Sequence, residues 1–357
     1  MKMILLITLC LLPRLVEAKI LFFGNATDPG LGLPTGHPNG YPFVWPDTLY
    51  VSEGIFNEAT CLDSDHEYQI QTGVNQFNGV LGEGWQPLDK FYAWTRKHRY
   101  YYLWYGGFMA GPGNGPGTRS KEAFINWVTA AAGRAPGIEY INFANEPIHA
   151  GSAHPFARQW GGAGSTGYDW LINIGKLFRA KFPNAQLGIN DFQQESSVDD
   201  LPYGPGQNKT QLPQFLRMVK VLKDAGVIDW VGLEGYSLET VPSEHLSSAL
   251  NQISQLGVKV IFTEFSPNAY TANKSTQLAN WQRLMSVILQ NPAVIGVSGP
   301  WSFRKSANGG VSGSQWIVDD SANPASNQGV DNPTMTWLKT FIPSVVGKPD
   351  PTQTSNP

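Results

Sequence analysis

Charged residues are scarce in this chain of 357 residues, because lysine, arginine, aspartate and glutamate together make up only 15% of it. In globular domains, charged residues usually make up roughly one quarter of the chain. The 25 basic and 28 acidic side chains leave a net charge of −3, without a basic block. Because nucleic-acid binding depends on neutralising phosphates, this balance argues against a nucleic-acid partner.

Cysteines and long apolar runs are also scarce. Lys2, the apolar residues 4–12 and Ala18 form the pattern of a secretory signal peptide over residues 1–18, with a buried N-terminal strand as the alternative. The run is too short for a bilayer, which needs ~20 residues. We therefore expect a secreted, extracellular protein that does not contact membranes. Cys10 would leave with the signal peptide, so Cys61 cannot form an intrachain disulfide and is expected to be a buried thiol.

Apolar residues make up 41% of the chain, enough for a large core, and they recur in short segments. Eight segments are predicted strands: residues 19–24, 56–61, 100–105, 138–144, 185–191, 228–236, 258–265 and 294–301. Amphipathic stretches between them predict helices: residues 121–132, 168–181, 212–225, 243–256 and 276–290. This alternation predicts βα units and a parallel sheet.

Eight such units favour one α/β domain, a single (β/α)8 TIM barrel over residues 19–346, with a doubly wound sheet as the alternative. Residues 347–357 are rich in Pro, Thr, Asn and Ser and are predicted to be a disordered tail. Three Asn-x-Ser/Thr sequons, at Asn25, Asn208 and Asn273, fit glycosylation on a secretory route.

Two carboxylates stand at the ends of apolar strands. Glu146 follows the fourth predicted strand and Glu264 lies at the end of the seventh. In a barrel these ends form the catalytic mouth. Glycoside hydrolysis requires two carboxyl groups there: one protonates the leaving oxygen, and the other attacks the anomeric carbon or activates water. The alternative is that each glutamate caps a helix or pairs with an arginine.

Several motifs resemble glycoside hydrolase family 10, the xylanase family among the clan A barrel hydrolases. Asn145-Glu146 and Thr263-Glu264 resemble its two catalytic motifs. Four further segments resemble its first, fifth, sixth and eighth strands: FGNATD at 23–28, LGINDF at 187–192, IDWVGLEGY at 228–236 and GVSGPW at 296–301. The motifs occur in order from about residue 20 to about residue 342.

The resemblance implies a retaining double displacement that needs no metal or organic cofactor. Glu264 would be the nucleophile, Glu146 the acid and then the base, and Asn145 the residue that holds the sugar 2-hydroxyl. Retaining enzymes place the two carboxyl groups ~5–5.5 Å apart. An ionised Glu264 is expected to raise the pKa of Glu146.

Other positions depart from the family pattern. After the second strand, Leu62, Asp63 and His66 replace its Glu, Asn and Lys. The third strand keeps Trp104 but not the usual His, and Glu234 and Tyr236 replace Gln and His in the sixth. Tyr236 can still donate a hydrogen bond to Glu264.

These changes indicate an altered sugar site, with Glu234 binding a sugar hydroxyl. They resemble the case of the fungal tomatinases, family members that remove an oligosaccharide from the glycoalkaloid α-tomatine. We expect a saponin or glycoalkaloid substrate, with endo-1,4-β-xylanase activity on cell-wall xylan as the alternative.

Further residues are predicted to bind the substrate: Asn190, Trp104, Trp301, Trp316, Asp63 and His66. For any single tryptophan, Trp85 included, packing in the barrel shell is the alternative. An inactive carbohydrate-binding barrel is disfavoured because both carboxylates are present. His149 and His154 lack zinc-ligand spacing, so no metal is expected. The expected partner is a carbohydrate or glycoconjugate alone, bound by a monomer.

Overall fold

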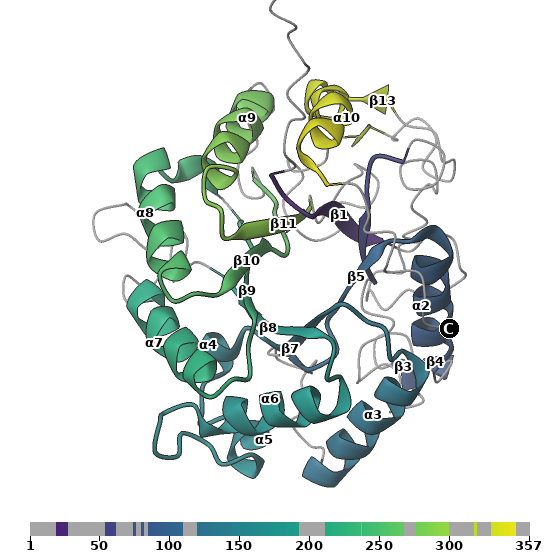
Figure 1. Cartoon of the computed structure of the whole chain (residues 1–357), viewed down its shortest axis with the longest axis vertical. Helices are drawn as coiled ribbons and strands as arrows, with labels where there is room; N and C mark the ends of the chain where they lie inside the picture. The colour runs from purple at the N-terminus through teal and green to yellow at the C-terminus, as the bar shows by residue number, and fades with distance from the viewer. Residues whose placement is uncertain are drawn as a thin grey trace, which may run out of the picture.

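A closed ring of parallel strands surrounded by helices forms the computed structural model of the protein (Figure 1). The structure describes residues 19–27, 54–61, 74–75, 80–81, 85–109, 120–192, 211–236, 238–267, 276–299, 318–319 and 330–347. The ring strands are β1 (Phe22–Thr27), β2 (Glu58–Cys61), β5 (Tyr101–Trp104), β7 (Tyr140–Asn145), β8 (Gln186–Asp191), β9 (Trp230–Leu233), β10 (Lys259–Phe262) and β11 (Val294–Ser298). Pairing of β1 with β11 and of β5 with β7 closes the ring.

The predicted barrel and its eight strands are therefore confirmed. The predicted helices are also present: α3 (Lys121–Arg134), α6 (Asp169–Lys181), α7 (Gln211–Asp224), α8 (Ser243–Ser254) and α9 (Gln277–Ile288). Further helices were not predicted: α2 (Gln86–His98), α4 (Pro147–Ala150), α5 (Pro155–Gln159), η2 (Leu238–Thr240) and α10 (Pro333–Val345).

Short strands lie beside the ring. β6 (Phe108–Met109) pairs in parallel with β7. β3 (Val74–Asn75) pairs with β4 (Val80–Leu81), and β12 (Val318–Asp319) with β13 (Val330–Asp331), both antiparallel.

Local capping sets where two helices begin. The Ser120 side chain accepts a hydrogen bond from the Ala123 amide at 3.1 Å, and Asn332 does the same for Met335 at 3.0 Å. Each satisfies a backbone N–H that has no partner within the first helical turn. The caps fix the residues at which α3 and α10 begin. From there, the apolar residues of each helix recur on the side that is buried against the barrel.

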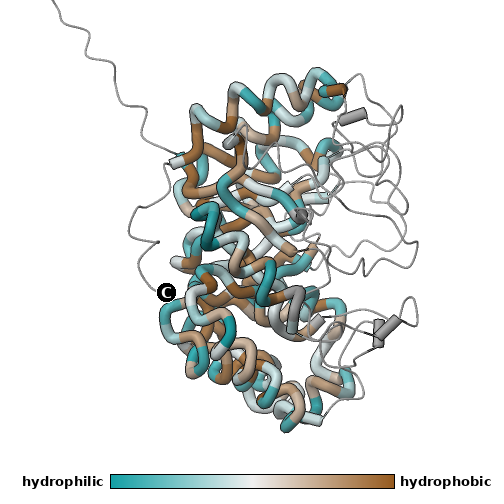
Figure 2. Tube along the Cα trace, turned by 90° about the vertical axis from the view of Figure 1, so that its right-hand side faces the viewer, coloured by the Kyte–Doolittle hydropathy of each residue, from teal (hydrophilic) through white to brown (hydrophobic). Residues whose placement is uncertain are grey.

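The two faces of the strands serve different purposes. Outward side chains pack with the helices in one large core, and hydrophobic positions follow the strands through the middle of the molecule (Figure 2). Inward side chains form a second apolar cluster: Phe22, Tyr101, Leu103, Tyr105, Tyr140, Trp230 and Ile261. Small residues make room for its rings, since a Cβ at Gly188 would lie 2.3 Å from the Trp230 indole. Polar side chains occupy the inward positions nearer the carboxyl ends of the strands.

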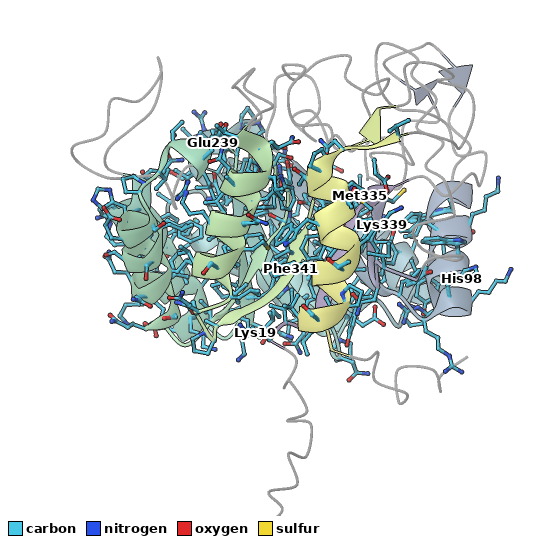
Figure 3. The ribbon with its side chains drawn as sticks, turned by 90° about the horizontal axis from the view of Figure 1, so that it is seen from above. Lys19, His98, Glu239, Met335, Lys339 and Phe341 are labelled. Atoms are coloured by element: carbon cyan, nitrogen blue, oxygen red, sulfur yellow. The ribbon has the colours of Figure 1, made fainter. Side chains whose placement is uncertain are left out.

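The first described residues and the end of α10 meet at the amino ends of the strands. The Lys19 amide donates to the Val345 carbonyl at 2.9 Å, and Ile20 forms a parallel bridge with Val346. In Figure 3, Lys19 lies at the lower end of the barrel and Glu239, just after β9, at the upper end. The carboxyl ends of the strands therefore face upward in that view.

Three expectations from the sequence concern side chains in this framework. Cys61 is a buried thiol, 3% exposed, as predicted. Asn25 is only 2% exposed, so a glycan does not fit there in the folded protein. Residues 1–18, the tail from 348 and the sequons at Asn208 and Asn273 lie outside the described residues. In the described part of the chain, no helix combines the length and apolar character needed to cross a membrane.

Glu58 is an ionisable group inside the barrel wall. Burial raises its pKa from 4.5 to about 8, although the hydroxyl groups of Thr60 and Ser298 partly offset this. Thr60 Oγ1 donates to Glu58 Oε1 at 2.8 Å. A Cβ on Gly24 would lie 2.2 Å from Glu58 Oε2, so only glycine leaves space for this carboxyl.

We expect Glu58→Gln to remove a pH dependence of stability. The folded protein keeps this proton up to about pH 8, whereas the unfolded chain loses it near 4.5. The contribution of the protonated Glu58 to the free energy of unfolding is thus fully present below pH 4.5, and it is lost as the pH rises to about 8. Urea unfolding across that range measures the difference, expected to be on the order of a few kcal/mol. Glu122→Gln on the exposed face of α3 is the matched control, and equal pH slopes in both variants would contradict the prediction.

Candidate active site

Three glutamates gather where the strands end at the upper opening of the barrel. Glu146 directly follows β7, Glu234 follows β9 and Glu264 lies two residues after β10. Glu234 is 3% and Glu264 9% exposed, and Glu146 is half-buried. Charged groups are rarely buried in this way unless they are paired or used, so this end of the barrel is the candidate active site.

The side-chain amide of Asn190, at the end of β8, joins the cluster. Its Nδ2 donates to Asn145 Oδ1 at 2.7 Å and lies 3.1 Å from Glu234 Oε1 and 3.3 Å from Glu264 Oε1. Its Oδ1 accepts a hydrogen bond from the Thr263 hydroxyl. One side chain thus links the ends of four strands.

Glu264 is surrounded by hydrogen-bond donors. The Tyr236 hydroxyl donates to Oε2 at 2.6 Å, and the Tyr105 hydroxyl donates to Oε1 at 3.2 Å, beside Asn190. Desolvation, followed by the charges of Glu264 and Glu234, raises the pKa of both tyrosines well above the ordinary value. Their hydroxyls therefore keep their protons, and donors of this kind favour the ionised carboxylate.

Glu146 has an unusual backbone conformation. Its φ of 51° and ψ of 45° lie in the left-handed region, which residues other than glycine rarely adopt. Its amide donates to the Asn190 carbonyl at 2.6 Å, and Pro147 follows as the first residue of α4. Such strain persists where the surroundings determine the geometry, and it is frequent at functional sites.

The pKa of Glu146 is raised from 4.5 to about 6. Burial is the main cause and the negative charge of Asp191 the second, while His149 and hydrogen bonds from Glu234 and Asn145 lower it. The predicted direction is confirmed. The leading causes are burial and Asp191 rather than the Glu264 charge that the sequence suggested.

Asp191 anchors the segment after Glu146. It is fully buried and accepts hydrogen bonds from the Ile148 amide at 2.8 Å and the Phe192 amide at 2.9 Å. His149 Nδ1 lies 2.6 Å from its Oδ1, and the imidazole stacks on the Phe192 ring at 3.6 Å. Gln211 donates to the Phe192 carbonyl at 2.8 Å, and its Nε2 lies 3.0 Å from His149 Nε2.

The structure brings together six of the predicted site residues: Glu146, Glu264, Glu234, Asn145, Asn190 and Tyr236. Four others, Trp301, Trp316, Asp63 and His66, lie outside the described residues. The expected spacing of the two catalytic carboxyls, ~5–5.5 Å, stays a prediction.

Trp104 was wrongly predicted to bind the substrate. It is fully buried and packs against Trp127, Phe178 and Phe182, between the barrel and its helices. Strand alternation explains this, because Tyr101, Leu103 and Tyr105 occupy the inward positions of the same segment. Trp85 likewise stacks on Trp127 in the shell.

Three residues of the site were not predicted: Tyr105, Thr263 and Asp191. For Tyr105, the alternation from Tyr101 was an available signal. Thr263 is adjacent to Glu264 in sequence, but its hydrogen bond to Asn190 joins the ends of β10 and β8, which lie on either side of β9. Nothing in the local sequence indicates that Asp191 approaches Glu146.

The described histidines show no metal-binding arrangement. Within the part of the chain that the structure describes, no group of three or more His, Cys, Asp or Glu side chains is placed to hold a metal ion. His154 instead accepts a hydrogen bond from the Phe156 amide at the start of α5 and packs edge-on against Phe108.

A cavity of about 530 Å³ adjoins the segment that follows Glu146. Pro147 and Ile148 form one wall, Tyr168 and Trp170 contribute aromatic surface, and α7 closes it with Arg217 among other residues. This volume is in the range of pockets that bind small molecules.

Comparison with known proteins places this site in a family. A sequence profile described as glycosyl hydrolase family 10 matches residues 104–318, which include the three glutamates. No curated protein sequence matches the chain.

Solved xylanase structures share the fold. Xylanase 10B from Thermotoga maritima superposes with a TM-score of 0.65 at 16% identity, covering 92% of this chain and 96% of its own. A thermostable xylanase mutant from Cellvibrio japonicus has a TM-score of 0.64 at 17% identity, covering 90% and 97%. A glycosylated endo-β-1,4-xylanase from Gloeophyllum trabeum has a TM-score of 0.61 at 18% identity, covering 84% and 91%. At these identities the likeness establishes the fold alone.

We expect His149→Phe to raise the pKa of Glu146 above its value of about 6, because a protonated His149 lowers it. Phenylalanine retains a ring that can stack on Phe192. The measurement is a 13C NMR titration of glutamate carboxyls, with the Glu146 resonance assigned through Glu146→Gln. His98→Phe, on α2 against Tyr100, is the control. An unchanged or lowered Glu146 titration in His149→Phe would disprove the electrostatic contribution of this residue.

Proposed function

Because the chain belongs to glycosyl hydrolase family 10 and is thus a glycoside hydrolase, we propose that it cleaves β-glycosides with retention, with Glu264 as nucleophile and Glu146 as acid and base. The contrast between the two carboxyls carries this proposal. Three donors surround Glu264, which favours its anion, whereas burial and Asp191 raise the pKa of Glu146 to about 6, so that Glu146 holds a proton to higher pH than an ordinary glutamate. A pair of acids in opposite environments suits one nucleophile and one proton donor.

In the first step, a Glu264 oxygen attacks the anomeric carbon while the bond to the leaving-group oxygen breaks. Glu146 gives its proton to that oxygen, so the products are a free aglycone and a covalent glycosyl-enzyme. Tyr236 and Tyr105 hold Glu264 in orientation before the attack.

In the second step, a water oxygen attacks the same carbon and the bond to Glu264 breaks. Glu146, now ionised, takes a proton from that water, which returns both glutamates to their starting states. Two displacements at one carbon retain the anomeric configuration.

Asn145 is suited to hold a sugar hydroxyl beside this reaction. Its Oδ1 accepts hydrogen bonds from Asn190 at 2.7 Å and from Asn142 at 3.2 Å. These two bonds fix the orientation of the amide group and leave Nδ2 to donate. A rigid donor at this position supports the assignment of Asn145 to the sugar 2-hydroxyl.

For the substrate, we propose a glycoconjugate with a bulky leaving group, such as the glycoalkaloid α-tomatine. We propose further that the protein is a secreted monomer that cleaves this substrate outside the cell. The acid protonates the leaving oxygen, so the leaving group lies on the Glu146 side of the site. The cavity of about 530 Å³ begins at the residues that directly follow Glu146 and offers the half-buried Ile148 and Tyr168 to an apolar aglycone. Xylan is the second candidate substrate, supported by the xylanase names of the structural neighbours.

The catalytic assignment predicts opposite products in two azide-rescue experiments. Glu146→Ala and Glu264→Ala should each reduce the turnover of an activated aryl β-glycoside by at least ~10²-fold, since each removes a group that acts in the transition state. Azide should then restore turnover, giving a β-glycosyl azide with Glu146→Ala and an α-glycosyl azide with Glu264→Ala, distinguished by NMR. Glu244→Gln, a surface change on α8, should leave turnover unaltered. The same anomer from both alanine variants would overturn the assigned roles.

The substrate proposal predicts tetrasaccharide release from α-tomatine in a side-by-side assay with beechwood xylan, using Glu264→Gln as the blank. Tyr168→Ala should raise KM for tomatine by several-fold and leave KM for a simple aryl glycoside unchanged, because only tomatine carries an aglycone large enough for the cavity. Chromatography of the released sugars is the measurement. Xylo-oligosaccharides as the sole products would identify an ordinary xylanase and refute the glycoconjugate substrate.

A further inference from the structure

The short helix α4 begins at the proposed acid, and the side chain of that residue does not cap it. An N-cap side chain commonly accepts a hydrogen bond from the backbone N–H two or three positions later. Glu146 is the N-cap residue of α4 and forms no such bond. Pro147 has no N–H, so the first donor of α4 is the amide of Ile148, and its acceptor must come from another part of the chain.

Asp191 supplies this acceptor from the neighbouring strand β8. Its Oδ2 accepts the Ile148 amide at 2.8 Å, and its Oδ1 accepts the Phe192 amide at 2.9 Å. The side chain is fully buried, so water does not replace either bond. A backbone N–H can only donate, so both oxygens must be acceptors. A carboxylate meets this requirement, whereas an asparagine side chain would set its NH2 group against one of the two N–H groups.

The same strand end also holds the backbone on the other side of Pro147. The Glu146 amide donates to the carbonyl of Asn190, the residue before Asp191, at 2.6 Å. Between these two ties, Glu146 has a φ of 51°, which costs free energy for a residue that carries a side chain. Without the tie from Asp191, the segment can relax to an ordinary conformation and turn the Glu146 carboxyl elsewhere.

We propose that Asp191 is a positioning residue for the acid and base: by capping α4 it holds the left-handed conformation of Glu146 and keeps the Glu146 carboxyl at the reacting oxygen atoms. This inference rests on the proposed role of Glu146. Asp191 is too deeply buried to contact the substrate, so it acts on the reaction through Glu146.

Aromatic and amide groups keep Asp191 in place beside the amides of Ile148 and Phe192. His149 Nδ1 lies 2.6 Å from Asp191 Oδ1, and the imidazole stacks on the Phe192 ring with the ring centres 3.6 Å apart. Gln211, at the start of α7, donates to the Phe192 carbonyl at 2.8 Å. The carboxylate is thus connected to α4 and α7 as well as to its own strand, and these elements together set its orientation.

The position of Glu146 matters in both steps of the reaction. In the first step its proton passes to the leaving oxygen, and in the second it takes a proton from the attacking water. A misplacement of about 1 Å can lower such a rate by ~10²-fold. An activated leaving group such as 2,4-dinitrophenolate departs without a proton, so only the second step then depends on Glu146. Loss of the tie from Asp191 should therefore affect substrates according to their leaving groups.

Asp191→Asn is the first test, since it keeps the volume of the side chain and removes one acceptor oxygen. We expect kcat/KM for a phenyl β-glycoside to fall roughly 10-fold or more, whereas kcat/KM for the 2,4-dinitrophenyl β-glycoside of the same sugar stays within about 3-fold. The kcat for the dinitrophenyl substrate should fall, because hydrolysis of the glycosyl-enzyme still needs the base. The burst of dinitrophenolate counts the folded active sites, so unfolded protein cannot imitate this pattern.

Asp229→Asn is the matched control. Asp229 Oδ2 accepts the Leu187 amide at 2.9 Å and pairs with Arg179, so it is also a carboxylate bound to a backbone N–H. It lies at the amino end of β8, however, far along the strand from Glu146. We expect the same kcat/KM per active site as in the parent protein on both glycosides.

A second variant removes the donor instead of the acceptor. Replacing Ile148 by the hydroxy acid that carries the same side chain turns its N–H into an ester oxygen and leaves Asp191 intact. We expect the same dependence on the leaving group as in Asp191→Asn. Crystal structures of both variants without substrate should show a Glu146 φ outside the left-handed region, against 51° in the parent protein.

Equal losses of kcat/KM on both glycosides would assign Asp191 a purely structural role and overturn the proposal, as would a Glu146 φ that stays near 51° in both variants. Glu146→Ala in the same two assays tests the proposed function separately. If that variant loses kcat/KM equally on both glycosides, Glu146 is not the acid, and the φ measurements then decide whether Asp191 holds this turn.

Discussion

The Asn190 side chain is the point on which the polar end of this barrel depends. Its amide nitrogen contacts Asn145, Glu234 and Glu264, and its oxygen accepts the Thr263 hydroxyl. Two amide hydrogens serve three acceptors, so the carboxyls must share donors, and each oxygen is confined to a narrow set of positions. The buried site keeps water from substituting for these bonds, which makes each of them stronger. The Asn190 side chain thus positions the Glu264 carboxyl, and the Asn190 backbone carbonyl holds the Glu146 amide.

The two catalytic glutamates differ because their neighbours differ, although their side chains are identical. Hydroxyl and amide donors surround Glu264, and a carboxylate is the state that such donors favour. Glu146 stands beside the buried Asp191, in a strained backbone conformation that Pro147 and the Asn190 carbonyl maintain. Burial and the charge of Asp191 favour its neutral form. Opposite protonation of two carboxyls at the same end of the barrel is what retaining glycoside hydrolysis requires.

The lower part of the barrel provides the rigid support for this arrangement. Large rings from Phe22, Tyr101, Tyr140 and Trp230 fill the interior, and glycines on neighbouring strands accept them. Tight packing of this kind has few alternative arrangements, so the register of each strand is closely determined. The register in turn decides how far the C-terminal end of each strand extends, and hence which side chains can meet there. Glu58 shows the tolerance of this packing for a polar group, provided that the carboxyl remains protonated.

The sequence by itself determined the elements and the pair of catalytic candidates. Apolar runs bounded by turn residues are local signals, so all eight strands were predicted, whereas α2 and α10 were missed. Glu146 and Glu264 could be placed at the mouth because strand ends in a barrel share one edge. Only the tertiary structure decided that Trp104 faces the helices while Tyr105 reaches Glu264, and that burial and the charge of Asp191 raise the pKa of Glu146. The physical reason is that desolvation and hydrogen bonding act over a few ångströms, and barrel closure sets those distances between residues far apart in the chain.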